Sequence, residues 1–169
     1  MILKPTLHTS RRIKLLAMAY LLLCAGCGWQ LQGVHRVSND LQPLYVQYVD
    51  QHSRFSRALQ DRLRFSGVQL VEEESQAKVV LQIINEDNGH RVISVSPQNT
   101  PLEYEIYYTV EFSLRSRKDE LLLQQPISSS QTMTYDETRA LAKQREENML
   151  SDTMAAELAD QLLRQIRRL

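Results

Sequence analysis

The clearest pattern in the chain is a strict alternation of apolar and polar side chains from Glu103 to Arg115. A period of two places successive side chains on opposite faces of a β-strand. The other face of this segment carries mostly polar or charged residues, so the pattern predicts a strand with one buried and one solvent-facing side. The residues of the buried face would be Tyr104, Ile106, Tyr108, Val110, Phe112 and Leu114.

Shorter segments on either side predict further strands. Leu44 to Val49 and Lys78 to Ile84 are rich in the residues that favour strands. Val68 to Val71 is a short strand or a connector. Leu121 to Met133 predicts a strand that returns beside the alternating one. Pro126 within it indicates an edge position or a bulge, because proline cannot donate a ladder hydrogen bond.

The segment between Ile84 and Val92 allows two arrangements. It contains Asn88-Gly89, and Asn-Gly flanked by strands is typical of a type I′ hairpin. The alternative is one long strand interrupted by a bulge at Gly89. The local residues leave both arrangements open. A clear loop follows at Ser96 to Pro101, which is rich in turn-forming residues.

Two segments carry the 3.6-residue spacing of helices. Ser53 is a suitable N-cap for the first, and Gly67 suits the position just after its end. Asp136 can cap the second if that helix reaches so far back. The predicted fold is α+β, with two helices packed on one face of a mixed, mainly antiparallel sheet of about four strands. The apolar stripe of the second helix is Leu150, Met154, Leu158, Leu162, Ile166 and Leu169.

The first 26 residues have the order of a secretory signal peptide. A basic segment precedes the apolar run Leu15 to Leu23, and small residues follow it. The run is too short to cross a bilayer as a helix. Ala25-Gly26-Cys27 resembles the cleavage motif of bacterial lipoproteins, although Cys24 stands where those usually have leucine. The alternative is an ordinary signal peptide cleaved nearby, which would leave Cys27 as a free thiol.

The lipoprotein resemblance implies a particular maturation and location. Cys27 would become the first residue, with a diacylglycerol on its sulfur and a palmitoyl chain on its amine. Gly28, where an aspartate would favour the inner membrane, implies lipid anchoring in the outer membrane of a Gram-negative bacterium. The expected organisation is a signal peptide (1–26), a lipidated tether (27–43) and a single α+β domain (44–169).

Charge and composition of the mature chain narrow the function. Cleavage removes four basic residues and no acidic ones, which takes the net charge from zero to −4. A mildly acidic protein is a poor binder of nucleic acid, so no nucleic-acid partner is expected. Cys27 would be the only remaining cysteine, and its lipidation leaves no intramolecular disulfide. The stability of the fold must then come from its hydrophobic core.

Catalytic patterns are missing from the sequence. The mature histidines, His35, His52 and His90, do not stand at metal-ligand spacing with one another or with cysteine. There is no Gly-x-Ser-x-Gly elbow and no glycine-rich phosphate loop. We therefore expect no enzyme activity, no metal and no cofactor.

A basic cluster at the start of the last helix is the strongest candidate site. Arg139 and Lys143 are four residues apart and share a helix face, where like charges repel. If the helix starts near Asp136, the positive end of its dipole also disfavours them. Such a site, together with Arg145, suits a bound anion such as phosphate. Alternatively, Lys143 pairs with Glu147 and Arg145 points to water.

Several short segments in order resemble the LptE family of lipopolysaccharide-assembly lipoproteins. They include Cys27 to Leu31 at the mature start, Ser56 to Leu59 with Gly67-Val68 around the first helix, Glu103-Tyr104 with Thr109-Val110 in the central strand, and Ala140 to Lys143 in the last helix. The resemblance covers nearly the whole mature chain.

The LptE resemblance implies an outer-membrane lipoprotein that plugs the β-barrel LptD, assists its assembly, binds lipopolysaccharide and helps deliver it to the outer leaflet. It assigns lipopolysaccharide binding to Lys143. From the charge pattern of the last helix, Arg139 or Arg145 would help to bind the phosphate. The second basic position of the family falls in the Ser96 to Pro101 loop, which has no base here. It also favours one long bent strand over the hairpin at Asn88-Gly89. The rival interpretation is a structural or pilot lipoprotein that chaperones another outer-membrane protein and has no glycolipid site.

Overall fold

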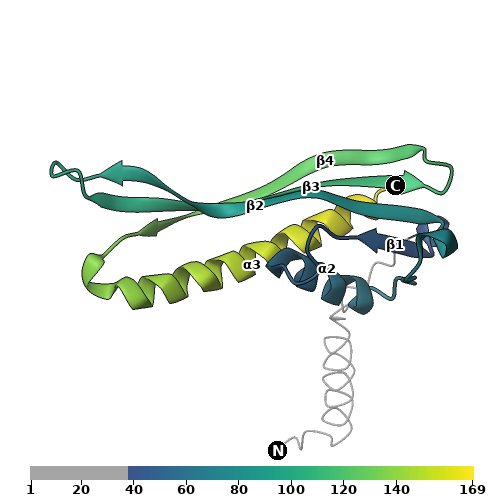
Figure 1. Cartoon of the computed structure of the whole chain (residues 1–169), viewed down its shortest axis with the longest axis horizontal. Coiled ribbons are helices and arrows are strands. Elements are labelled where there is room, and N and C mark those ends of the chain that lie inside the picture. The colour runs from purple at the N-terminus through teal and green to yellow at the C-terminus, as the bar shows by residue number, and fades with distance from the viewer. Residues whose placement is uncertain (1–37) are drawn as a thin grey trace, which may run out of the picture. The chain divides into compact units, whose positions relative to one another are not determined.

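The computed structural model describes residues 38–169, in which one mixed sheet carries two helices on a single face (Figure 1). The strand order is β1-β2-β3-β4, with β1 parallel to β2 and the other pairs antiparallel. This confirms the expected α+β fold. The elements are η1 (Asn39–Leu41), β1 (Leu44–Gln47), α2 (Arg54–Phe65), η2 (Glu74–Gln76), β2 (Val79–Val95), β3 (Pro101–Ser116), β4 (Leu121–Thr134), η3 (Glu137–Arg139) and α3 (Ala140–Ile166).

The long strand β2 settles the choice at Asn88-Gly89. The strand runs through these residues without a turn, so the predicted type I′ hairpin is wrong. The alternative of one long strand, which the LptE resemblance favours, is confirmed, but its bulge does not lie at Gly89, because Gly89 pairs in regular register with Tyr107. The long-range pairing with β3 satisfies the backbone along the whole segment and outweighs the local turn preference of Asn-Gly. His90, which lies in the segment between Ile84 and Val92, is therefore part of a strand.

Bulges in β2 occur on either side of the predicted position. The register against β3 shifts between Ile83 and Asn85, and shifts again after Val92. Gly89 instead gives room to an aromatic ring across the sheet, since a Cβ there would lie 3.1 Å from the Tyr107 hydroxyl oxygen. Strand β4 pairs only with β3 and forms one edge of the sheet, which is the edge position predicted from Pro126.

Local capping chemistry sets the start of α2 and of the short turn before α3. The Ser53 hydroxyl accepts a hydrogen bond from the Ser56 backbone N–H at 3.0 Å, and Gly67 adopts a positive φ of 68° just beyond α2. The start of α3 differs from expectation. Asp136 caps the short 3-10 turn η3, and α3 itself begins at Ala140. The cap and the long helix are thus separated by one tight turn.

The core lies between the sheet and the two helices. Ile106, Tyr108, Val110, Phe112 and Leu114 of β3 are all buried, as the alternation predicted, whereas Tyr104 is only half-buried. Burial of each such large apolar side chain contributes about 1.5–3 kcal/mol before ordering costs. The helices supply the facing side chains, including Phe55, Leu59 and Leu63 from α2 and Met154, Leu158 and Leu162 from α3.

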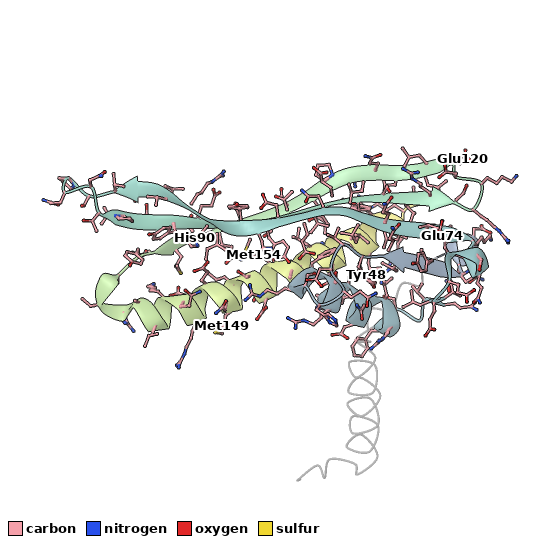
Figure 2. The ribbon with its side chains drawn as sticks, viewed as in Figure 1. Tyr48, Glu74, His90, Glu120, Met149 and Met154 are labelled. Carbon is pink, nitrogen blue, oxygen red and sulfur yellow. The ribbon has the colours of Figure 1, made fainter. Side chains whose placement is uncertain are left out.

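Helix α3 changes character along its length. Its buried residues begin at Ser151, whereas its first ten residues are exposed or half-buried. Figure 2 shows the change at two methionines, with Met154 directed toward the sheet and Met149 directed away from it. The first half of α3 therefore projects beyond the main core, along the far part of β2 and β3 (Figure 1).

The signal peptide and Cys27 lie outside the described residues. Within residues 38–169, no helix is both long and apolar enough to span a bilayer. The end of the expected tether is folded, since residues 39–41 form η1 and Leu41 is buried in the core.

Candidate functional site

The first turns of α3 and the far halves of the strands enclose a cavity of about 260 Å³, here called the lysine pocket. The chain reaches it by a short connection after β4. The Asp136 carboxylate accepts bonds from the backbone N–H and the hydroxyl of Thr138, at 3.0 and 2.6 Å. These bonds hold the pKa of Asp136 below its usual value. The residues that line the pocket include His90, Tyr104, Met133, Tyr135, Lys143 and Glu147.

Lys143 is the basic residue inside the pocket. Only 19% of its side chain is exposed, and its Nζ lies 2.9 Å from Oε2 of Glu146. The alternative pairing with Glu147 is not the one observed, because Glu147 turns to His90 instead. Lys143 thus has one carboxylate partner, on its own helix. An ammonium group has three donors, so it can bind a further anion while keeping this contact.

A histidine–carboxylate pair joins the two walls of the pocket. The Nδ1 atom of His90 on β2 lies 2.8 Å from Oε1 of Glu147 on α3. Figure 2 shows His90 at this part of the sheet, toward the start of α3. The contact ties the projecting half of α3 to the strand.

Three rings line the strand side of the pocket. His90 and Tyr104 meet edge to face with centroids 5.1 Å apart, and Tyr104 meets Tyr135 in the same way at 5.2 Å. Edge-to-face contacts hold aromatic rings in fixed relative positions. The pocket therefore combines one ammonium group with a rigid aromatic wall, an arrangement that suits a phosphorylated ligand with a hydrocarbon or sugar surface.

The structure does not bring the other two candidate bases into this pocket. Arg139 ends η3 and is exposed, although its neighbour Ala140 lines the pocket. Arg145 is also exposed and lines a separate groove of about 390 Å³ along α3, together with Glu146 and Met149. The predicted cluster is therefore one half-buried lysine with two arginines outside it.

Sequence reasoning did not assign the aromatic residues and Glu147 to a site. Their proximity depends on the pairing of β2 with β3, which places Val92 opposite Tyr104. No local motif reveals that register. A signal was present only in the spacing of Lys143 and Glu147, one helical turn apart.

Arg91 lies on the other face of the sheet. Its guanidinium binds the Glu105 carboxylate and sits 5.9 Å above the Tyr107 ring. The hydrogen bond from Arg91 lowers the pKa of Glu105. Because successive strand residues point to opposite faces, Arg91 is directed away from the pocket that contains His90. It does not supply the second base of the site.

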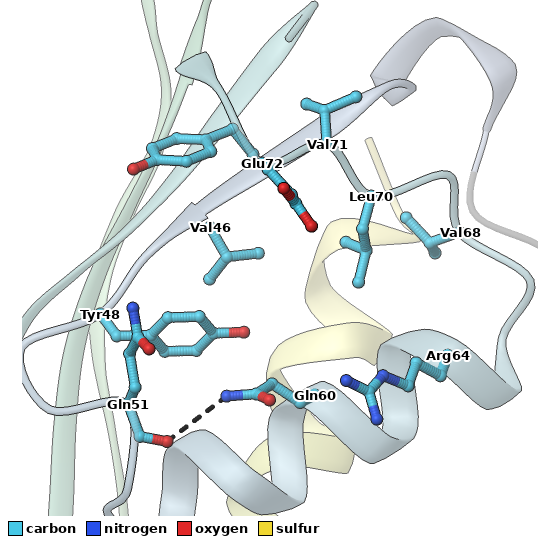
Figure 3. A pocket seen from close by; sticks show the side chains of 10 residues that line it. Val46, Tyr48, Gln51, Gln60, Arg64, Val68, Leu70, Val71 and Glu72 are labelled. Carbon is cyan, nitrogen blue, oxygen red and sulfur yellow. Dashed lines mark hydrogen bonds between the residues drawn. The ribbon is translucent and has the colours of Figure 1, made fainter. Parts of the chain in front are cut away.

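A larger cavity of about 760 Å³ lies between β1, α2 and the segment after α2 (Figure 3). Its lining includes Tyr48, Gln60 and Arg64, and burial raises the pKa of Tyr48 to about 12. The side-chain amide of Gln60 donates to the Gln51 carbonyl at 3.4 Å across one end. None of the candidate binding residues lines this cavity. Among the described residues, no group of three metal-ligating side chains could hold an ion.

The chain is similar to known proteins over most of its length. The family model LptE, described as lipopolysaccharide-assembly, matches residues 41–166. The LPS-assembly lipoprotein LptE of Pectobacterium atrosepticum is 25% identical over 148 residues, covering 86% of this chain and 79% of that protein. The protein of the same name from Yersinia enterocolitica is 27% identical over 159 residues, covering 92% and 75%.

Solved structures show the same fold. Rare lipoprotein B of Shewanella oneidensis superposes with a TM-score of 0.65 at 28% identity, covering 73% of this chain and 92% of that one. Lipoprotein B of Nitrosomonas europaea gives a TM-score of 0.70 at 22% identity, covering 83% and 90%. The second likeness concerns the fold alone.

Proposed function

Because this chain belongs to the LptE family of lipopolysaccharide-assembly proteins, we propose that it binds lipopolysaccharide in the lysine pocket and acts with the β-barrel LptD. In this proposal it plugs the barrel, assists its assembly and helps to deliver lipopolysaccharide to the outer leaflet of the outer membrane. It works by binding and not by catalysis. The observation that carries the binding proposal is the half-buried Lys143 beside an aromatic wall.

The proposed headgroup contact follows from the charges at the pocket. The lipid part of lipopolysaccharide carries phosphate groups on a sugar backbone. Lys143 would bind a phosphate as a point charge, and its partial burial strengthens that attraction relative to a fully solvated lysine. The start of α3 adds the positive end of the helix dipole, since Ala140 lines the same pocket. Arg139 and Arg145 would make weaker, solvent-exposed contacts with the rest of the headgroup.

Loss of charge at Lys143 tests the binding site. We expect Lys143→Ala to lower the affinity of the purified mature domain for lipopolysaccharide by about tenfold, a typical loss for one charged contact. Lys118→Ala is the matched control, because Lys118 is exposed in the β3–β4 turn at the other end of the sheet (Figure 1). Equal affinities of the two variants would show that the lysine pocket is not the site.

The anchor and the barrel partner need a second experiment. We propose that Cys27 carries the N-palmitoyl and S-diacylglycerol groups and holds the chain on the outer membrane, since two or more acyl chains give stable anchoring. Cells that express the chain should incorporate labelled palmitate into it, and the Cys27→Ala form should incorporate none. Purification of the tagged lipoprotein in detergent should recover LptD in equal ratio. A different outer-membrane partner would instead favour the pilot-lipoprotein function.

A further inference from the structure

The β2–β3 hairpin ends in an exposed apolar surface. Val92, Ile93, Val95 and Leu102 are 46, 48, 51 and 45% exposed, and together they are called the apolar hairpin end. Strand β4 pairs no farther than Glu103, so only two strands continue beyond it. Figure 1 shows this end of the hairpin extending past the start of α3, where neither helix covers it.

Such a cluster is unusual for a solvated hairpin. Single exposed apolar residues are common on protein surfaces, but contiguous groups of large ones usually mark a contact surface. The turn that joins the strands is polar, so the apolar residues are confined to the strand ends below it. They are not among the residues that pack on the described core.

Two residues of the apolar hairpin end, Val92 and Leu102, lie on the pocket face of the sheet beside the aromatic wall. Val92 is the register partner of Tyr104, a residue of the pocket wall. The backbone carbonyl of Leu102 accepts a hydrogen bond from the N–H of Tyr135, another wall residue, at 2.8 Å. Val92 also lies two residues from His90 on the same strand, so both point to the same face. A ligand in the pocket therefore has an apolar surface directly beside it.

We propose that the apolar hairpin end contacts the acyl chains of the same glycolipid whose phosphorylated headgroup lies in the lysine pocket. A cationic pocket with an exposed apolar surface beside it matches an anionic amphiphile, in which charge and hydrocarbon are joined at short distance. A sugar phosphate without acyl chains would contact only the lysine pocket and not the apolar hairpin end. The inference rests on the proposed lipopolysaccharide function and adds the part of the ligand that the hairpin recognises.

Two probes separate the headgroup from the chains. One is diphosphorylated lipid A with acyl chains short enough to remain monomeric, and the other is the same disaccharide after complete deacylation. The test variant is Val92→Ser with Leu102→Ser, because both residues lie on the face of the sheet that carries His90 and Tyr104 and neither lines the pocket. Phe65→Ser is the matched control, since Phe65 on α2 is exposed and lies far along the chain from the hairpin. Affinities would be measured by calorimetry.

The inference requires an effect that depends on the chains. We expect the double variant to lose about tenfold in affinity for the acylated probe, because two apolar contacts are removed, and to bind the deacylated probe as the wild type does. Phe65→Ser should change neither. Unchanged binding of the acylated probe, or an equal loss for both probes, would overturn the inference.

Failure of the proposed function gives a different result. If Lys143→Ala binds the deacylated probe as tightly as the wild type does, the headgroup site is wrong, whatever the hairpin variant shows. A photoreactive diazirine on an acyl chain gives a second measurement on the wild-type protein, in case the double variant does not fold. Labelling within residues 92–102 supports the acyl contact, and labelling only elsewhere overturns it.

Discussion

At the scale of single residues, one hydroxyl group connects three elements of the fold. Tyr108 is buried in β3, and its hydroxyl donates to the Glu86 carboxylate of β2. The same oxygen accepts the Phe55 backbone N–H of α2 at 3.3 Å. Glu86 also accepts a bond from the Ser53 hydroxyl at 2.8 Å, and Ser53 caps the helix. The start of α2 is thus tied to the sheet by polar contacts within an apolar core.

Removal of this hydroxyl should destabilise the protein. We expect Tyr108→Phe to lower the free energy of unfolding by about 1–3 kcal/mol, because Phe55 and Glu86 each lose a partner in a poorly solvated place. Tyr107→Phe, on the solvent-facing side of the same strand, should stay within about 0.5 kcal/mol of the wild type. Urea denaturation of the described domain measures both. Equal effects of the two substitutions would contradict the proposed network.

Tyr108 should also lower the free energy of unfolding of the protein in alkali. Burial raises the pKa of Tyr108, and the hydrogen bond and charge of Glu86 raise it further. The unfolded state then releases the phenol proton first, so this contribution is full below the ordinary phenol pKa of about 10 and is lost as pH rises above it. Burial raises the pKa of Tyr48 to about 12, which acts in the same direction.

Denaturation at about pH 9 and at about pH 11 tests this sign. The free energy of unfolding of the wild type should fall between the two, and that of Tyr108→Phe should fall less. Tyr48 remains in the variant, so part of the fall should persist. A parallel fall in both proteins would mean that Tyr108 does not contribute.

At the scale of secondary-structure elements, the sequence predicted what depends on local chemistry. The alternation in β3, the Ser53 cap and the end of α2 at Gly67 were all predicted. The local residues left the course of β2 open, because Asn88-Gly89 carries a strong turn preference; the LptE resemblance favoured one long strand, which the pairing with β3 confirms. The lysine pocket was predicted only in part. Lys143 was found from charge and helix position, whereas its aromatic wall depends on strand register.

Alanine substitutions at Gly67 and Gly89 should have different costs, because Gly67 lies in a turn and Gly89 in a strand. Gly67 has a positive φ of 68°, so Gly67→Ala should cost about 1–2 kcal/mol. Gly89 has an ordinary strand conformation, and an added methyl group only needs the Tyr107 hydroxyl to move by a few tenths of an ångström. Gly89→Ala should therefore change the free energy of unfolding by less than about 1 kcal/mol. Urea denaturation measures the free energy of unfolding of both variants. An equal loss in the two would favour a turn at Gly89.

At the scale of the whole domain, the sheet has two unlike faces. The helices lie on one face of the sheet (Figure 1), and the buried apolar residues of β3 belong to it, whereas Glu103, Glu105, Thr109 and Glu111 belong to the opposite face. Thr109 lies near the middle of this face, with Asp87 and Ser128 as its neighbours on the adjacent strands. The lumen of a large β-barrel is polar. A helix-free polar sheet face is therefore a suitable contact surface for the proposed barrel partner.

A bulky residue at Thr109 tests that contact at the level of the complex. Thr109→Trp should leave the free energy of unfolding within about 0.5 kcal/mol of the wild type, since the position is not part of the core. It should lower the amount of LptD recovered with the tagged lipoprotein, because the new side chain prevents close approach of the barrel wall. Thr153→Trp, exposed on α3, is the control and should recover LptD as the wild type does. Full recovery with Thr109→Trp would place the barrel contact on the helices and loops.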